Sequence, residues 1–143
     1  MLVYLLAALQ KQQYNLRILH WKATGLDFET THAAILDGYI DQFGDYIDKV
    51  AEMMLMCGEE IPTSREIDEL ASKDERIGMS LKVIDYESEE IYMILDKIFM
   101  DIISIIKSCS SSNKYPSYIC SELDSIEYWF SLEGKYKNKK RLK

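Results

Sequence analysis

Two histidines and three carboxylates fall within one stretch of the sequence and are the side chains best suited to chemistry. His20 and His32 are the two histidines of the chain, and the carboxylates are Asp37, Asp48 and Glu52. Imidazole nitrogens and carboxylate oxygens are ligands of first-row metals such as iron and zinc. Metal-dependent chemistry is therefore the first function to consider.

The pair Asp48 and Glu52 is spaced for joint binding of one cation. Residues four positions apart in a helix differ by only about 40° around its axis, so both carboxylates lie on one face. No lysine or arginine lies four positions before Asp48 or three positions after Glu52. A solvated acidic face is the alternative interpretation of this pair. For the two histidines, the alternatives are structural roles in the core, at an interface or at a helix end.

The spacing along the chain argues against a complete site within one subunit. A self-contained di-iron bundle uses Glu-x-x-His motifs on two helices, and no Glu of this chain is followed by His three positions later. Asp48 follows His32 by sixteen residues, which corresponds to about 24 Å along a straight helix. Two copies packed antiparallel about a two-fold axis would bring these ends together. The sequence therefore predicts a site shared between subunits.

Apolar residues recur with helical spacing along most of the chain and predict four long helices. The expected helices run from about Leu2 to Lys22, from a cap at Thr30 or Thr31 to Gly58, from about Met79 to Ser108, and from Tyr115 and Pro116 to Gly134. A short capped helix is expected after Pro62, in the connection between the second and third helices. Residues 1–134 are therefore predicted to form one all-α domain, a four-helix bundle with the crossover that is a ferritin-like trait.

The charge of the chain is divided between an acidic body and a basic C-terminal end. The net charge of the 143 residues is −7, but six of the 17 basic residues fall in the last nine positions. They are Lys135, Lys137, Lys139, Lys140, Arg141 and Lys143. An acidic body attracts cations and repels nucleic acids and membranes, whereas a basic tail is typical of an arm that contacts nucleic acid. We expect a disordered tail over residues 135–143 that either binds DNA or is simply solvated.

The cysteines and the first residues of the chain give an expectation for its cellular location. Three cysteines are present without Cys-x-x-Cys spacing, which favours a reducing compartment. The apolar start of the chain lacks the charged region and the cleavage site of a signal peptide, and it is too short to cross a membrane. These features predict a cytoplasmic protein.

The order of the candidate ligands resembles that of the Dps family, the mini-ferritins known as DNA-binding proteins from starved cells. The resemblance lies in His20-Trp21-x-x-x-Gly25-x-x-Phe28-x-x-x-His32, then Asp37, Asp48-x-x-Ala51-Glu52 and Gly58-x-x-x-Pro62. It extends to the short helix after Pro62 and to the segment from Ser121 to Trp129. Most of the chain is therefore covered.

The resemblance implies a ferroxidase, an oxidoreductase that oxidises Fe(II) with hydrogen peroxide or dioxygen. Members of the family store the ferric mineral in a hollow cage of twelve subunits, which protects against oxidative damage. Iron would be the metal, with zinc as a possible substitute. His20 and His32 of one subunit and Asp48 and Glu52 of its partner would be the ligands. Trp21 would lie near the iron, where family members have an aromatic residue that intercepts radicals.

Asp37 departs from the family pattern. The first family aspartate lies four residues after the second histidine, where this chain has Leu36, and Asp37 lies five residues after His32. In an ideal helix this shift turns the carboxylate by about 100°. Either His32 lies in the loop before the helix, or a π-bulge absorbs the additional residue. Asp37 is a ligand only if one of these arrangements compensates for the shift.

Two other functions stay open on the sequence alone. One is a nucleoid-associated, DNA-compacting assembly of the Dps type with a degenerate metal site. Many family members bind DNA through basic N-terminal arms, which are absent here, and the basic C-terminal tail would substitute through salt-dependent contacts with phosphates. The other is a helical bundle that neither binds metal nor forms a cage.

Overall fold

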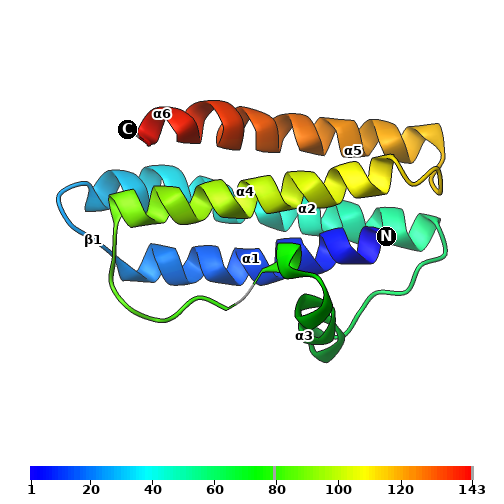
Figure 1. Ribbon diagram of the computed structural model, residues 1–143, viewed down its shortest axis with the longest axis horizontal. Coiled ribbons are helices and arrows are strands. Elements are labelled where there is room, and N and C mark those ends of the chain that lie inside the picture. Colours follow the sequence, from blue (N-terminus) through cyan, green and yellow to red (C-terminus); the bar gives the residue numbers. More distant parts are fainter. Residues whose placement is uncertain (79, 143) are drawn as a thin grey trace.

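The computed structural model describes residues 1–78 and 80–142, and within them the chain is almost entirely helical (Figure 1). Four long helical rods lie side by side: α1 (Leu2–Lys22), η1 with α2 (Thr30–Leu36 and Asp37–Met56), α4 (Ser88–Ser110), and α5 with η3 and α6 (Ser117–Phe130, Ser131–Asn138 and Lys139–Arg141). The shorter elements are α3 (Ser64–Lys73), η2 (Glu75–Ile77), and the two-residue strands β1 (Ala23–Thr24) and β2 (Tyr86–Glu87). The predicted all-α class is therefore confirmed.

The turn after α2 follows the local signal at Gly58. The φ angle of Gly58 is +74°, which lies in the left-handed region that glycine adopts without a Cβ clash. The N–H of Gly58 donates to the carbonyl of Leu55 (3.2 Å), and that of Glu59 donates to the carbonyl of Met54 (2.8 Å). These two bonds form a Schellman motif that satisfies the last carbonyls of the helix.

The short helix predicted after Pro62 is present as α3. Thr63 Oγ1 accepts a hydrogen bond from the Glu66 N–H (3.2 Å), and Glu66 Oε1 accepts one from the Thr63 N–H (3.0 Å). This reciprocal capping box also lowers the pKa of Glu66, because the hydrogen bond from the Thr63 N–H favours the ionised carboxylate. Ile67 is the buried residue of α3, which projects from the side of the bundle in Figure 1.

The second helical rod starts earlier than predicted. The backbone is already helical at Glu29 (φ −63°, ψ −41°), and neither Thr30 nor Thr31 caps a helix, since both lie inside η1. Thr31 is buried instead, and its hydroxyl bonds across the bundle to Ser88 Oγ (2.8 Å) and Tyr92 Oη (3.0 Å). A threonine that was expected to act locally therefore connects two distant parts of the chain.

The third long helix begins later than predicted. It was expected near Met79, which lies outside the described residues, but α4 begins only at Ser88. Before it, β2 pairs in parallel with β1, and Tyr86 lies opposite Ala23. A capping box, in which the Glu90 side chain accepts a hydrogen bond from the Glu87 N–H (3.2 Å), then starts the helix. The apolar spacing before residue 86 therefore belongs to a connection rather than to a helix.

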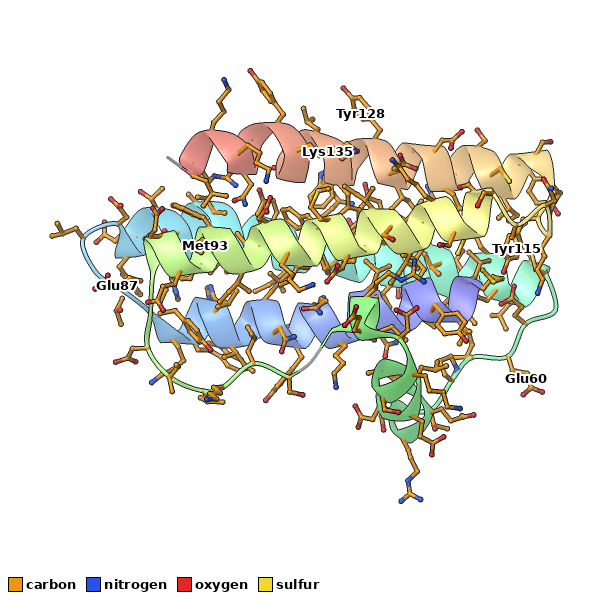
Figure 2. All side chains as sticks on the ribbon, in the orientation of Figure 1. Glu60, Glu87, Met93, Tyr115, Tyr128 and Lys135 are labelled. Atoms are coloured by element: carbon orange, nitrogen blue, oxygen red, sulfur yellow. The ribbon has the colours of Figure 1, made fainter. Side chains whose placement is uncertain are left out.

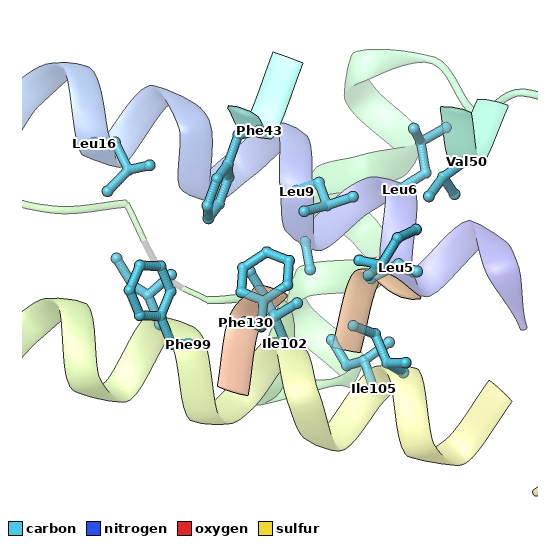
Figure 3. Close-up of a cluster of buried hydrophobic side chains, with 14 of the residues drawn as sticks. Leu5, Leu6, Leu9, Leu16, Phe43, Val50, Phe99, Ile102, Ile105 and Phe130 are labelled. Carbon is cyan, nitrogen blue, oxygen red and sulfur yellow. The ribbon is translucent and has the colours of Figure 1, made fainter. Parts of the chain in front are cut away.

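Aromatic rings from three rods fill the middle of the core (Figure 3). Phe43 of α2, Phe99 of α4 and Phe130 of α5 are fully buried, and their centroids lie 5.4 to 6.3 Å apart. Leucines of α1, including Leu9 and Leu16, are also fully buried in this cluster. Because these side chains join all four rods, the core fixes α1 and α2 beside each other.

The basic C-terminal segment is helical, which corrects the expected disordered tail. α5 continues through η3 and α6 to Arg141 without leaving the bundle. Asn138 is fully buried, and its Nδ2 donates to the carbonyl of Tyr92 (2.8 Å). Gly134 permits this close packing, since a Cβ there would lie 2.7 Å from the Cβ of Phe99. The domain therefore extends beyond residue 134, the boundary expected from the sequence.

Candidate metal centre

The histidine pair, His20 and His32, meets at the end of the bundle where α1 stops and η1 begins. The two imidazole rings are stacked, with centroids 3.7 Å apart and planes inclined by 14°. Nδ1 of His20 lies 2.9 Å from the carbonyl oxygen of His32, and Nδ1 of His32 lies 2.6 Å from the carbonyl oxygen of His20. Each histidine therefore binds the backbone of the other.

These contacts determine which ring nitrogen is available to a metal. A carbonyl oxygen only accepts hydrogen bonds, so Nδ1 of both rings must carry the hydrogen. Among the described residues, none forms a hydrogen bond with Nε2 of His20 or His32. Histidine ligands commonly donate one ring N–H to a carbonyl or carboxylate while the other nitrogen binds the metal. The histidine pair has this arrangement within one chain.

The π-helical segment η1 brings Asp37 to the histidine pair. Oδ1 of Asp37 lies 3.2 Å from Nδ1 of His20. A π-helix joins residues i and i+5 instead of i and i+4, so its wider turn suits the five-residue spacing of His32 and Asp37. Of the two arrangements that the sequence left open, the structure has the π-helical one, extended over seven residues.

Two neighbours of the histidine pair were not identified as part of the site from the sequence. Phe28 stacks on His32, with ring centroids 4.7 Å apart, so three rings lie in one stack. Thr31 anchors the same turn to α4 through its bonds to Ser88 and Tyr92. Phe28 belongs to the motif that carries the family resemblance, but nothing in the spacing indicated the contacts of Thr31, because they join residues far apart in sequence.

The carboxylate pair, Asp48 and Glu52, lies near the other end of α2. Both side chains are exposed and line a surface hollow together with Gln42, Asp45, Tyr46 and Lys49. Burial, with a smaller contribution from Asp45, raises the pKa of Tyr46 to about 12. The Lys49 ammonium forms an ion pair with Glu122 of α5, so the one cation among the described lining residues already has a carboxylate partner. The hollow is open to solvent and acidic.

One chain does not bring the predicted ligands together. The structure joins Asp37 to the histidine pair, and it leaves the carboxylate pair eleven residues further along α2. Across residues 1–78 and 80–142, no three His, Cys, Asp or Glu side chains converge to hold a metal ion. The predicted ligands therefore do not form a complete metal site within the described residues of one chain.

Trp21 lies on the surface of α1. Its side chain is 59% exposed, and its ring meets the edge of Tyr14 at a centroid distance of 6.3 Å. Among the described residues, the Trp21 ring contacts the ring of Tyr14 and not the rings of the histidine pair. Its expected place near a metal depends on what covers this surface.

The basic residues expected to bind nucleic acid are largely engaged within the bundle. Lys137 pairs with Glu133 and Lys139 with Asp96 (2.9 and 2.8 Å). Arg141 donates to the hydroxyl of Tyr39 (2.8 Å), whereas Lys140 lies over the ring of Tyr136. Lys135 is exposed, and Lys143 lies outside the described residues. The segment is therefore not a free basic arm, because the ion pairs and the buried Asn138 hold it against α4.

Comparisons with known proteins found a protein of similar fold but nothing that indicates an activity. No protein-family model matches the chain, and no curated protein matches it either. The crystal structure of Helicobacter cinaedi CAIP is similar in fold, with a TM-score of 0.57 and 22% sequence identity over 92% of this chain and 95% of that one. Among the described residues, no helix has both the length and the apolar character needed to cross a membrane.

Proposed function

We propose that this chain oxidises Fe(II) with hydrogen peroxide or dioxygen and stores the ferric product in a cage of ferritin-like subunits. The observation that carries this proposal is the histidine pair, in which carbonyl groups hold both Nδ1 atoms and both Nε2 atoms are left without a partner among the described residues. Asp37 Oδ1 lies 3.2 Å from Nδ1 of His20, on the side of the ring away from Nε2, where its negative charge helps to orient the imidazole. Imidazole and carboxylate together form a donor set that suits iron.

The remaining ligands would come from a partner subunit. Asp48 follows Asp37 by eleven residues in α2, which corresponds to about 16 Å along the helix axis. If two copies pack antiparallel about a two-fold axis, the carboxylate pair of each lies beside the histidine pair of the other. Each dimer would then contain two equivalent sites, and a monomer would contain none.

Exposed apolar side chains at both ends of this surface support the pairing. Tyr14 and Trp21 of α1 are seven residues apart and are both more than half exposed. At the far end of α2, Leu55 and Met56 are each 63% exposed. They follow Asp48 and Glu52 by seven and four residues, so they share the helix face of the carboxylate pair. Antiparallel packing would cover both apolar ends and place Trp21 near the shared site.

Charge complementarity favours the same arrangement. Arg17 lies between Tyr14 and Trp21 on the exposed side of α1 and forms no ion pair with a described residue. Asp41 and Asp45 are exposed on α2, between the histidine end and the carboxylate pair. A partner that presents Arg17 to this acidic face would offset part of its repulsion.

The groups of the site have distinct roles in the proposed reaction. The carboxylates attract Fe(II) and offset its charge, and the Nε2 lone pairs bind it without adding charge. One hydrogen peroxide accepts two electrons, one from each of two Fe(II) ions, and its O–O bond breaks. With two further waters, the products are two FeOOH units and four protons.

The direct test is the rate of Fe(II) oxidation. Fe(II) added anaerobically and then treated with peroxide should give an amber solution that stays clear. The double variant His20→Ala, Glu52→Ala should show no acceleration over Fe(II) in buffer, with an unchanged circular dichroism spectrum. A wild-type rate equal to that of the double variant would refute the proposal.

Sharing of the site can be tested by complementation. His20→Ala and Glu52→Ala single variants should each be inactive alone, because every site lacks one ligand. When equal amounts are unfolded together and refolded, random pairing makes half of the dimers mixed, and each mixed dimer has one intact site. About one quarter of the wild-type activity should return. If no activity returns although light scattering shows dimers, the whole site would lie within one subunit.

The size of the particle separates the remaining alternatives. A cage of twelve subunits stays a prediction, which light scattering or mass photometry would test. A monomer without iron oxidation would favour a helical bundle that binds no metal. The contacts of Lys137, Lys139 and Arg141 within the chain argue against DNA binding by a free C-terminal arm.

A further inference from the structure

Another surface hollow lies between α4 and the C-terminal helix. Its lining consists of Met100, Ile103, Ser104, Lys107, Ser108, Ser111 and Lys135. Among the described residues, the lining therefore contains two ammonium groups, three hydroxyl groups and no carboxylate. In a chain with 24 acidic and 17 basic residues, a hollow of this composition is positive against an acidic background.

The two lysines of this hollow have uncompensated charges. Neither Lys107 nor Lys135 forms an ion pair with a described residue. Six other lysines of the helical rods, by contrast, pair with a carboxylate: Lys11, Lys22, Lys49, Lys97, Lys137 and Lys139. Four other hollows on the described surface each include at least one carboxylate in their lining.

The packing of the rods fixes the position of Lys135. Gly134, the residue before it, is buried against α4, since a Cβ there would meet Phe99. Lys135 therefore follows the point of closest approach between η3 and α4, and Figure 2 shows it on the C-terminal helix above α4. The two ammonium groups come from different elements, so the bundle, and not a local turn, brings them to one hollow.

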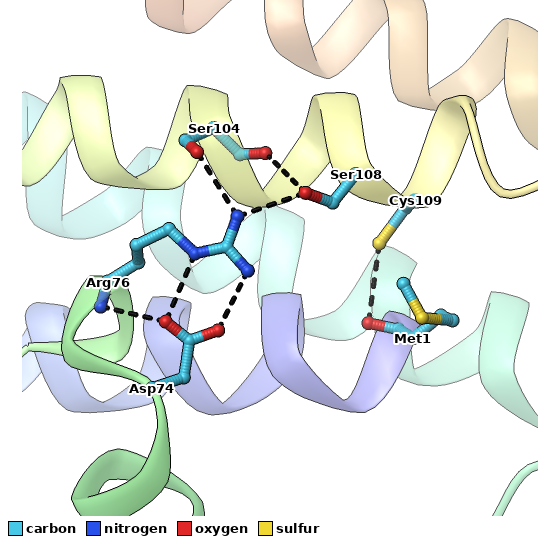
Figure 4. Close-up of polar contacts among 6 residues, drawn as sticks. All are labelled: Met1, Asp74, Arg76, Ser104, Ser108 and Cys109. Atoms are coloured by element: carbon cyan, nitrogen blue, oxygen red, sulfur yellow. Dashed lines mark hydrogen bonds and ion pairs between the residues drawn. The ribbon is translucent and has the colours of Figure 1, made fainter.

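An arginine behind the serines polarises the hydroxyl lining (Figure 4). Arg76 Nη1 donates to Ser104 Oγ (3.1 Å) and to Ser108 Oγ (3.0 Å), while Asp74 balances the guanidinium charge. The Ser108 hydroxyl donates its hydrogen to the carbonyl oxygen of Ser104 (3.1 Å). The hydroxyl hydrogen of Ser104 has no acceptor among the described residues, and a hydroxyl that accepts from a guanidinium is a better donor.

We propose that the hollow between α4 and η3 binds a phosphate group. Lys107 and Lys135 supply the charge, and the Ser104 hydroxyl supplies a directed hydrogen bond to a phosphate oxygen. Free inorganic phosphate and the backbone phosphate of a nucleic acid share this chemistry. The site is independent of the proposed metal centre, since it uses none of its residues.

Equilibrium dialysis of the metal-free, full-length protein with radiolabelled inorganic phosphate tests the proposal. At constant ionic strength, the wild type should bind phosphate saturably. The double variant Lys107→Gln, Lys135→Gln should bind at least about tenfold more weakly, and Ser104→Ala should be intermediate, because charge-assisted hydrogen bonds are lost. The matched control Lys82→Gln, Lys114→Gln removes the same charge from exposed lysines elsewhere and should bind like the wild type.

The outcomes separate the proposal from general charge attraction. Absence of saturable binding, or an equal loss in the control variant, would overturn it. A short DNA duplex added as a competitor distinguishes the two sources of phosphate. Displacement of phosphate by the duplex would show that a backbone phosphate enters the hollow, whereas retention of phosphate would assign the site to the free anion.

Discussion

At one end of the second helical rod, the histidine pair is stacked and hydrogen-bonded within the chain; at the other end, the carboxylate pair faces solvent. The histidine end contains buried side chains such as Thr31, a widened turn and reciprocal side-chain to backbone bonds. At the carboxylate end, two side chains are exposed on a regular helix, and neither forms a hydrogen bond or an ion pair with residues 1–78 or 80–142. The same rod thus carries one ordered and one unordered half of the candidate site.

This difference indicates which half of the candidate site the chain must hold in a defined geometry, at a cost in free energy, before a metal binds. Imidazole ligands need a defined tautomer and orientation, and the chain supplies both through its own carbonyl groups. Carboxylates accept a metal in several geometries, so they can remain mobile until the partner and the cation arrive. We therefore expect substitutions at the histidine end to change stability and substitutions at the carboxylate end to change activity alone.

The largest effect is expected for Asp48→Asn combined with Glu52→Gln. Fe(II) oxidation should fall by about 100-fold or more, since even changes behind the ligands cost about 10- to 100-fold. The free energy of unfolding in urea should stay within about 0.5 kcal/mol of the wild type, because both side chains are exposed. The control Asp124→Asn, Glu89→Gln removes the same charge elsewhere and should keep its activity. A large loss of stability in the first variant would contradict the comparison.

The start of α2, next to the histidine end, should respond to alkaline pH through Tyr39. Burial raises the pKa of Tyr39 to about 12, and the bonds with Arg141 and Glu133 modify it less. The unfolded chain loses this proton near pH 10, so the stabilisation is complete below pH 10 and is lost as the pH rises to about 12. Urea titrations should show a decrease of about 2 to 3 kcal/mol from this group across that window. Tyr39→Phe should flatten the decrease, and Tyr128→Phe, at an exposed position, should not.

Thr31→Val tests the order of the histidine end. Valine has the same shape but removes the hydroxyl that bonds to Ser88 and Tyr92. The unfolding free energy should fall by about 1 to 2 kcal/mol, because the partly buried hydroxyls of Ser88 and Tyr92 lose a hydrogen-bond partner. Thr30→Val is the matched control, since Thr30 is the exposed neighbour in the same turn. Equal effects of the two variants would show that Thr31 does not anchor this end.

The smallest effect is expected for deletion of Ala33, an exposed residue of η1. The deletion shortens the spacing of His32 and Asp37 to four residues, which an ordinary α-helix places on one face. Stability should change by less than about 1 kcal/mol, Fe(II) oxidation should persist, and the π-helical segment should disappear from a crystal structure. Deletion of Asp45 is the control: α2 has no widened turn there to absorb it, so it should unfold the protein or strongly destabilise it.

The sequence predicted those features that depend on neighbouring residues. Gly58 and the capping box of Thr63 and Glu66 defined helix ends, because caps are made within a few positions. The residue types at positions 20 and 32 indicated ligands, but the orientation of the rings follows from their stacking and was not predictable from spacing.

Contacts distant in sequence account for the errors. The start of α4 was misplaced because the pairing of Tyr86 with Ala23 overrides helical spacing before residue 86. The C-terminal segment was expected to be disordered from its charge, yet Asn138 is buried against α4 and bonds to Tyr92, 46 positions earlier. Local composition carries no information on either contact.

The parallel pairing of β1 with β2 has a consequence for the order of folding. It joins Ala23 to Tyr86, and the adjacent bonds of Thr31 span 57 and 61 residues. Contacts between residues so far apart in sequence form only after a long loop has closed, and this closure has a large entropic cost. We therefore expect the anchoring of the histidine end to α4 to form last. The mutual bonds of His20 and His32 span only 12 residues and can form earlier, so a nascent chain would hold the histidine pair before this end of the bundle is fixed in place.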